Sequence, residues 1–463
     1  EEEESMIEMI TNVNSAVNNV VWGWPALILL GFTGVLMTSM TGFFQLSHLG
    51  HWLKNTIGSI FSDRNITRHT EDRSISQFQS LCTALAATVG TGNIVGVATA
   101  LVAGGAGALF WMWIAAFLGM ATIYAEALMA QKYKTVGADG QVTGGPVYYI
   151  RAAFKGTFGK VLAGIFAVLI TLALGFMGNA VQSNSIAAAF HTAFGIPQWI
   201  MGVVVAVIAL FVFAGGIERI AKVTETIVPL MAALYIVGAL IVIIYNYKNI
   251  PYAFASIFVG AFAPQSVVGG AAGATVKLAL TKGVARGLFS NEAGMGSTPH
   301  AHAVAKVNHP VEQGFVAMAG VFIDTFIVLN LTALVILTTK SIPTGKTGAE
   351  LSQYAFSTLY GKGGNIFIAI CMFFFAFSTI IGWYFFGQAN VKYLFGPKAV
   401  KIYSVLAAVC VFLGSLAEVD LVWNMADCFN SLMVIPNILA LFALSKVISQ
   451  VHKDYFKNFN KAK

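Results

Sequence analysis

The stretch AATVGTGNIVGVA, residues 86–98, decides the fold of this chain. It lies inside a long apolar segment, yet it contains Gly90, Gly92 and Gly96 with Thr91 and Asn93 between them. Such a cluster is useful in a membrane helix only where the backbone bends, opens or approaches another group closely. An opened helix frees N–H and C=O groups that lipid cannot satisfy, so the opening must face protein, a ligand or an ion. The stretch predicts a broken helix that forms a binding site near the middle of the membrane; the alternative is a glycine-rich face for helix packing.

The composition is that of a membrane protein. The 463 residues are 57% hydrophobic and only 10% charged, with a mean hydropathy of +0.75, whereas about 25% of the residues in a soluble domain are charged. Apolar runs of about 20 residues recur along the chain, which favours membrane helices and excludes a barrel. The net charge of +7 comes from basic residues that flank these runs. It therefore indicates a lipid bilayer rather than a nucleic acid as the partner.

We predict an all-α polytopic membrane protein with eleven transmembrane helices. The predicted spans are 23–45, 77–102, 107–132, 160–192, 197–214, 220–245, 281–305, 313–338, 363–395, 399–417 and 419–446. The remaining segments are predicted as an N-terminal extracellular segment (1–22), a cytoplasmic linker lying in the membrane interface (46–76), an external loop with short or re-entrant helices (247–280) and a cytoplasmic tail (447–463).

The distribution of basic residues predicts the orientation. With the N-terminus outside and the spans alternating, 20 of the 27 Lys and Arg residues lie on the inner side. Because cytoplasmic loops are enriched in Lys and Arg, this arrangement is favoured over its inverse. We expect a protein of the cell membrane with the C-terminus in the cytoplasm.

A second polar interruption matches the first. The span 281–305 contains SNEAGMGST, residues 290–298, and the span 77–102 contains TVGTGN, residues 88–93. Each span opens a run of five, so the two runs (77–246 and 281–446) have opposite orientations. Paired interruptions in inverted halves are the best sequence pointer to a secondary-transporter site. The fold prediction is thus a ten-helix core of two inverted five-helix repeats, the first helix of each broken.

These residues resemble a known family. VGTGN, residues 89–93, resembles the broken first core helix of the leucine-transporter fold, and GLFSNEAGMGS, residues 287–297, resembles the signature of the alanine/glycine:cation symporter family. The likeness in span order covers residues 20–450. It implies sodium-coupled uptake of alanine or glycine by alternating access, and it implies that the span 23–45 is an addition to the ten-helix core.

An amino acid is a zwitterion, and the two interruptions offer groups for both of its charges. Amides of Gly90, Thr91 and Gly92, with the Asn93 side chain, suit its carboxylate because a helix N-terminus attracts anions. Carbonyls freed around 289–291 suit its ammonium group. A crowded pocket selects small side chains, since an extra methylene costs about 1–3 kcal/mol. The further candidates for the substrate site are Phe176, Asn179, Gln182, Phe289, Ser290, Asn291, Met295 and Trp383.

One adjacent hydroxyl pair, Ser378 and Thr379, lies in the very apolar stretch FFFAFSTIIGW, residues 373–383. The resemblance to the fold aligns this pair with sodium-binding hydroxyls and adds the backbone carbonyls of Ala86, Val89 and Phe375 as ligands. The alternative is that both hydroxyls bond back to carbonyls of their own helix, as membrane Ser and Thr often do.

Five carboxylates lie within predicted spans and are expected to face the protein interior because charge is costly in lipid. They are Glu126, Glu225, Glu292, Asp324 and Asp427. Glu292 and Asp324 are candidates for a proton or second sodium site, and the alternative is a structural ion pair or a gate. His300 and His302 face different sides of a helix and are not expected to bind a metal.

Other functions fit less well. A proton-coupled amino-acid transporter is the main alternative to sodium coupling. A membrane-embedded enzyme is disfavoured because the sequence has no HExxH, GxSxG or P-loop motif. A channel is disfavoured because channels usually repeat a filter around a symmetry axis. A single chain suffices for the predicted fold.

Overall fold

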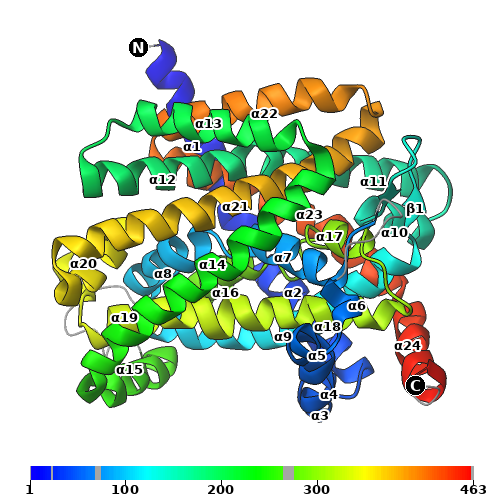
Figure 1. The fold of residues 1–463 in the computed structure, drawn as a ribbon, viewed down its shortest axis with the longest axis horizontal. Helices are drawn as coiled ribbons and strands as arrows, with labels where there is room; N and C mark the ends of the chain where they lie inside the picture. The colour runs from blue at the N-terminus through cyan, green and yellow to red at the C-terminus, as the bar shows by residue number, and fades with distance from the viewer. Residues whose placement is uncertain (1, 22–23, 68–73, 264–275, 460–463) are drawn as a thin grey trace.

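The computed structural model describes residues 2–21, 24–67, 74–263 and 276–459. Most of the long helices run along the horizontal direction of Figure 1 and so share a common axis. Seven helices in the described ranges are long and apolar enough to cross a membrane, and one bent pair would make an eighth span. The predicted polytopic helical architecture is confirmed. A β-hairpin (residues 135–143) and α24 (Ser445–Asp454) lie at one end of the bundle, and α15 (Ile250–Phe262) and α20 (Gly348–Tyr360) lie at the other (Figure 1).

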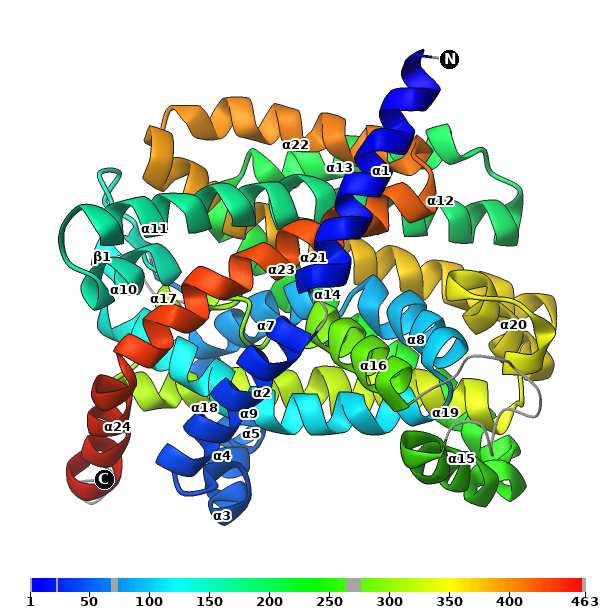
Figure 2. The ribbon, with the colours of Figure 1, turned by 180° about the vertical axis from the view of Figure 1, so that it is seen from behind.

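The N-terminal region contributes one long helix, one apolar helix and a series of short ones. These are α1 (Glu2–Val21), α2 (Trp24–Met40), α3 (Phe44–Ser47), α4 (Leu49–Leu53), the π-helical η1 (Lys54–Gly58), α5 (Ser59–Ser62) and α6 (Arg64–Thr67). Figure 2 shows α1 crossing α23 (Val419–Ala443). The Asn18 side chain donates a hydrogen bond to the Asn424 carbonyl (3.0 Å). The segment expected outside the membrane is therefore a helix packed on the bundle.

The next helices, up to Tyr245, include the first interruption. They are α7 (Gln77–Thr88), the π-helical η2 (Gly92–Gly96), α8 (Val97–Gly104), α9 (Gly107–Lys132), α10 (Pro146–Ala153), α11 (Gly156–Ile170), the π-helical η3 (Thr171–Gly178), α12 (Asn179–Phe194), α13 (Gln198–Phe213) and α14 (Gly216–Tyr245). A short antiparallel hairpin, β1 (Thr135–Val136) and β2 (Val142–Thr143), follows α9.

The remaining helices include the second interruption. They are η4 (Tyr247–Asn249), α15 (Ile250–Phe262), α16 (Val276–Asn291), α17 (Pro299–Ala303), α18 (Pro310–Val321), the π-helical η6 (Phe322–Leu329), α19 (Asn330–Thr338), η7 (Ile342–Thr344), α20 (Gly348–Tyr360), α21 (Lys362–Phe395), α22 (Ala399–Leu416), α23 (Val419–Ala443), α24 (Ser445–Asp454) and η8 (Tyr455–Phe459).

Local chemistry explains where α7 begins. Ser76 and Gln79 form a capping box, in which each side chain satisfies a backbone N–H of the other residue. At the other end of the helix, Val89 has left helical geometry (φ −80°, ψ 86°). The helical path then bends by 48° between α7 and the segment that starts at Gly92. The first predicted interruption is confirmed.

The linker after the first apolar helix presents two different faces. Trp52, Thr56 and Ser59 are buried against the protein, whereas Leu46 and Leu49 are exposed. Leu53 and Ile60 pack against the core, so the apolar side chains of the linker are divided between its two faces. Its position in the membrane interface stays a prediction.

The segment 247–280 contains a short helix, as expected. In α15, Gly260 approaches Gly107 of α9 so closely that a Cβ on Gly107 would lie 2.1 Å from the Gly260 carbonyl carbon. The Trp111 indole donates to the Ala261 carbonyl (3.2 Å). The possible re-entrant part, residues 264–275, lies outside the described residues.

Candidate functional site

The backbone amides freed by the first interruption are satisfied by side chains. The Gly90 N–H donates to Asn93 Oδ1 (2.9 Å), and the Thr91 N–H donates to Gln182 Oε1 of α12 (3.1 Å). All four residues are buried. Two of the amides expected to hold a carboxylate therefore bond to amide oxygens in this structure, so a carboxylate ligand would exchange with them.

Glycine in this interruption provides space. Neither Gly90 nor Gly92 has a positive φ. A Cβ on Gly90 would lie 2.3 Å from Thr379 Oγ1, and a Cβ on Gly92 would lie 3.1 Å from the Ser290 Cα. At Gly90 the interruption packs against α21, and at Gly92 the chain packs against the end of α16. The two predicted interruptions thus meet.

The second interruption, residues 292–298, is held open by a different device. Glu292, Gly294 and Gly296 all have positive φ (58°, 94° and 78°). The amides of Gly294 and Gly296 donate to the Glu126 carboxylate of α9 (3.4 and 3.1 Å), and Asn437 donates to the same group. Glu126 therefore faces the interior, as predicted, and its carboxylate accepts the freed backbone donors.

Asp324 of η6 joins the two interruptions. Its carboxylate is fully buried and accepts from Asn93 Nδ2 (2.8 Å) in the first interruption. It also accepts from the Ser290 hydroxyl (2.9 and 3.0 Å) beside the second, and from Thr325 Oγ1 (2.9 Å). Asn291 in turn donates to Thr325 Oγ1 (3.2 Å). One acidic side chain therefore connects both halves of the predicted site.

Glu292 is also fully buried, and its hydrogen-bond donors are uncharged, as are those of Asp324. It accepts from the Ser297 hydroxyl and from the Trp383 indole N–H. Arg286, which precedes it in α16, instead forms two hydrogen bonds of 2.8 Å with Asp427 of α23. The ion pair considered as the alternative role of Glu292 and Asp324 is therefore not the one that Arg286 makes, since Arg286 pairs with Asp427.

Aromatic rings close one side of the site. The Phe289 ring lies 5.7 Å from the Trp383 ring, edge to face, and 4.8 Å from the Trp423 ring. The Arg286 guanidinium lies 4.8 Å from the centre of Trp423. Phe176 is directed elsewhere, because its ring packs against Tyr403 of α22 (5.5 Å). Sequence reasoning missed Trp423 and the Arg286–Asp427 pair.

The five predicted sodium ligands converge. Thr379 Oγ1 lies 2.8 Å from the Ala86 carbonyl oxygen, 3.5 Å from that of Val89 and 3.0 Å from that of Phe375. Ser378 Oγ lies 3.4 Å from the Ala86 oxygen and 2.9 Å from the Phe375 oxygen. Back-bonding to the helix's own carbonyl therefore occurs together with contacts to α7. Neutral oxygens from two helices meet here, which suits a small hard cation.

Several buried polar atoms in this region have no hydrogen-bond partner within the described residues. They include Thr91 Oγ1, Asn179 Oδ1 and Ser183 Oγ. Asn179 and Ser183 lie one turn apart on α12, the helix that also provides Gln182 to the first interruption. An unpaired buried polar group is costly, so these atoms suit a polar ligand. Met295 is buried within the second interruption.

Cavities at the two ends of the bundle differ in size. A cavity of about 520 Å³ opens beside α20 and is lined by Gln353, Arg286 and Trp423. At the opposite end, a cavity of only about 20 Å³ is lined by Thr143, His300 and Gln388. Trp423 contacts Phe289, so the larger cavity reaches the aromatic side of the site.

The hairpin β1–β2 is tied to the end of the bundle with the smaller cavity. Lys392 in the last turn of α21 forms an ion pair with Asp139 in the hairpin turn. Burial raises the pKa of the Asp139 carboxyl, but the hydrogen bond and charge of Lys392, together with backbone N–H donors, outweigh this effect and hold the pKa below its usual value. Nearby, His300 bonds to Asn390 and His302 to Gln313.

Comparison with known proteins gives a consistent result over nearly the whole chain. The sequence profile of the sodium:alanine symporter family matches residues 7–463. The sodium/alanine symporter AgcS of Methanococcus maripaludis is 42% identical, with 98% of this chain and 100% of that protein covered. The amino-acid carrier protein AlsT of Bacillus subtilis is 38% identical, with 98% and 93% covered.

Solved structures show the fold. MhsT in complex with L-phenylalanine has a TM-score of 0.57 at 15% identity, with 84% of this chain and 99% of that chain covered. The Eremococcus coleocola manganese transporter has a TM-score of 0.50 at 14% identity, with 84% and 82% covered. The similarity identifies the leucine-transporter fold.

Proposed function

Because this chain belongs to the sodium:alanine symporter family, we propose that it couples the inward movement of sodium to the uptake of a small neutral amino acid, alanine or glycine. The family and the relatives are transporters and not enzymes. The relative AgcS is named a sodium/alanine symporter. Alternating access between the two ends of the bundle would move both solutes.

The contact of the Thr379 hydroxyl with the Ala86 carbonyl oxygen is the observation that carries sodium coupling. It joins α21 to the last turn of α7, next to the interruption that offers amides to the substrate. Sodium held by Ala86, Val89, Phe375, Ser378 and Thr379 would fix that interruption and so favour substrate binding. Uncharged ligands also allow release of the ion, which a carboxylate cage would oppose.

The substrate would lie between the two interruptions. Its carboxylate would replace Asn93 and Gln182 at the amides of Gly90 and Thr91, and Gly92 leaves room for it. Its ammonium group would meet oxygens at the end of α16. The candidates that bound this space are Asn179, Phe289, Ser290, Asn291, Met295 and Trp383, and their crowding supports a small side chain.

We further propose eleven spans, with α2 outside a core of two inverted five-helix repeats. α2 (Trp24–Met40) and α13 (Gln198–Phe213) are shorter apolar helices, and each would cross the membrane. The inverted repeats would run over 77–246 and 281–446. The N-terminus would lie outside the cell membrane and the C-terminus inside, and one chain would suffice for transport.

The sodium gradient is sufficient for accumulation. One charge moving through 100 mV provides about 2.3 kcal/mol. A tenfold sodium ratio adds about 1.4 kcal/mol. For one sodium per substrate, these terms together permit roughly several-hundred-fold accumulation of a neutral amino acid.

Counterflow of labelled alanine in proteoliposomes tests the proposal. Exchange should require sodium, fail with potassium in its place, and leave the alanine chemically unchanged. Labelled glycine should compete at similar concentrations. Equal exchange in potassium would remove sodium from the mechanism.

Proton coupling is the second candidate, and the buried Asp324 and Glu292 carboxylates favour it. Their hydrogen-bond donors are Asn, Ser, Thr and Trp side chains rather than fixed cations. Either group would hold a proton or a second cation. The same counterflow assay, repeated over pH 5–8 without sodium, distinguishes the candidates, because proton coupling predicts exchange that rises as the pH falls.

A further inference from the structure

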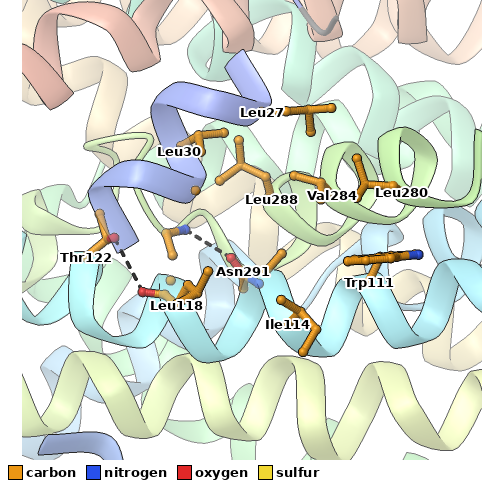
Figure 3. Close-up of a pocket in the computed structure, with 14 residues that line it drawn as sticks. Leu27, Leu30, Trp111, Ile114, Leu118, Thr122, Leu280, Val284, Leu288 and Asn291 are labelled. Atoms are coloured by element: carbon orange, nitrogen blue, oxygen red, sulfur yellow. Dashed lines mark hydrogen bonds between the residues drawn. The ribbon is translucent and has the colours of Figure 1, made fainter. Parts of the chain in front are cut away.

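An apolar crevice lies between α2, α9 and α16, on the outer surface of the proposed core. It encloses about 170 Å³. Figure 3 shows that α2 contributes Leu27 and Leu30, and that α16 contributes Val284 and Leu288 on the facing side. An apolar cavity of about 150 Å³ is large enough to hold benzene, so this crevice has room for several methylene groups.

The polar atoms of the crevice have partners in the protein. Thr122 Oγ1 donates to the Leu118 carbonyl (3.5 Å). Asn291 donates to Thr325 and accepts from the Ala293 N–H (3.1 Å). The lining therefore has no need for a polar ligand, and an apolar occupant fits it.

The crevice opens beside exposed apolar side chains. Ile114 of α9, in its lining, is 41% exposed, and Ile28 of α2, beside Leu27, is 64% exposed. The proposed spans would place both side chains against the bilayer. An acyl chain can therefore enter from the membrane without crossing a polar region.

A cationic group marks one end of the crevice. Lys277 lies one turn before Leu280, another residue of the α16 lining, and Trp24 lies one turn before Leu27. Lys277 Nζ is 5.9 Å from the Trp24 ring centre. Tryptophan and lysine are typical of the membrane–water interface, and a lysine there attracts lipid phosphate.

We propose that this crevice binds one phospholipid, with an acyl chain between α2 and α16 and the phosphate at Lys277. The inner end of the crevice reaches Asn291 and Ala293, where α16 stops. The bound chain would therefore pack against the half-helix that carries Phe289 and Ser290. Lipid binding stands independently of the proposed function; an effect of the lipid on transport rests on it.

Native mass spectrometry of the full chain tests the binding. The protein is released from detergent after incubation with phosphatidylglycerol or with diacylglycerol of the same acyl chains. We expect one phosphatidylglycerol retained per chain and weaker retention of diacylglycerol. Equal retention of the two would overturn the phosphate site at Lys277.

Two variants address the two parts of the site. Gly31 lines the crevice and a Cβ on it has no atom within 4 Å, so Gly31→Leu fills the crevice without a backbone clash. We expect at least about tenfold weaker binding, because several methylenes lose their site. Lys277→Gln should weaken phosphatidylglycerol binding roughly fivefold, as one basic residue near a lipid phosphate contributes a factor of that size.

Ile28→Leu on the exposed side of α2 is the matched control and should bind as the unmodified protein does. Unchanged binding in both Gly31→Leu and Lys277→Gln would overturn the site, and an equal loss in the control would show nonspecific annular lipid. Lys277→Gln alters an exposed side chain, so its result remains informative if Gly31→Leu folds poorly. Alanine counterflow in the same variants shows separately whether the lipid affects transport.

Discussion

The interruptions at 89–91 and 292–298 both contain glycine, but they use it differently. In the first, Gly90 does not have a positive φ, nor does Gly92 directly after it, and the two glycines leave space for Thr379 and Ser290. In the second, Gly294 and Gly296 take positive φ angles, and their amides turn toward Glu126. The first interruption is shaped by the close packing of Thr379 and Ser290 against its glycines, whereas the second is shaped by the left-handed backbone conformation of its own glycines. Substitutions in the first should therefore alter ligand binding, and substitutions in the second should alter stability.

Gly90→Ala should have the largest effect. Its Cβ would lie 2.3 Å from Thr379 Oγ1 and 3.1 Å from Gln182 Oε1. Overpacking of this kind costs about 1–3 kcal/mol, so the sodium concentration for half-maximal alanine uptake should rise roughly five- to hundredfold. Gly96→Ala is the control, because the nearest atoms to its Cβ are 4.0 Å away. Equal sodium activation in the two variants would contradict the spatial role of Gly90.

Asn93→Ala should have the second-largest effect. Asn93 donates to the buried Asp324 carboxylate, which also accepts from Ser290 beside the second interruption. Losing a donor to this carboxylate costs about 1–3 kcal/mol and loosens the contact between the two interruptions that bound the substrate. The half-saturating alanine concentration should rise roughly tenfold. Asn291→Ala, directly before the second interruption, is the comparison. Asn291 reaches Asp324 only through Thr325 and also accepts from the Ala293 N–H of its own turn, so this variant should change alanine affinity less. The reverse order would contradict the role of Asn93 in joining the two interruptions.

Thr379→Ala should affect sodium more than alanine. It removes the hydroxyl that contacts the Ala86 and Phe375 carbonyls. The loss of one such oxygen contributes about 1 kcal/mol, so half-maximal sodium should rise roughly fivefold, with little change in alanine affinity at saturating sodium. Thr379→Ser keeps the hydroxyl and should restore sodium activation. If uptake by Thr379→Ala keeps its normal sodium dependence, the Thr379 hydroxyl is not a sodium ligand.

Gly294→Ala should have the smallest effect on transport and a clear effect on stability. Its φ of 94° is strained for an L residue, which costs about 1–3 kcal/mol. The melting temperature in detergent should fall by a few degrees, while the sodium and alanine affinities of the folded protein stay near normal. Gly287→Ala in α16, whose Cβ would have its nearest neighbour at 3.5 Å, should melt normally. A selective loss of alanine affinity in Gly294→Ala would remove the distinction between the two interruptions.

The sequence was sufficient to predict both interruptions, because glycine among hydroxyl and amide residues is unusual inside apolar helices. It did not predict how the freed amides are satisfied, since Gln182 and Glu126 lie on other helices. Arg286 and Asp427 are 141 residues apart, and no local pattern relates them. Phe176 lies in the π-helical η3, where an extra residue per turn shifts the faces expected from a 3.6-residue period.

The ion pair between Asp139 and Lys392 connects the hairpin to the end of α21, and it is complete over a defined pH range. The pKa of Asp139 is lowered by Lys392, so the ion pair is complete above the usual aspartate range and weakens only as the pH falls through that lowered value. Acidification from pH 8 to pH 5 therefore leaves this ion pair intact. The hairpin therefore contributes nothing to a change in turnover across that interval, and an acid-sensitive group has to be sought elsewhere in the protein.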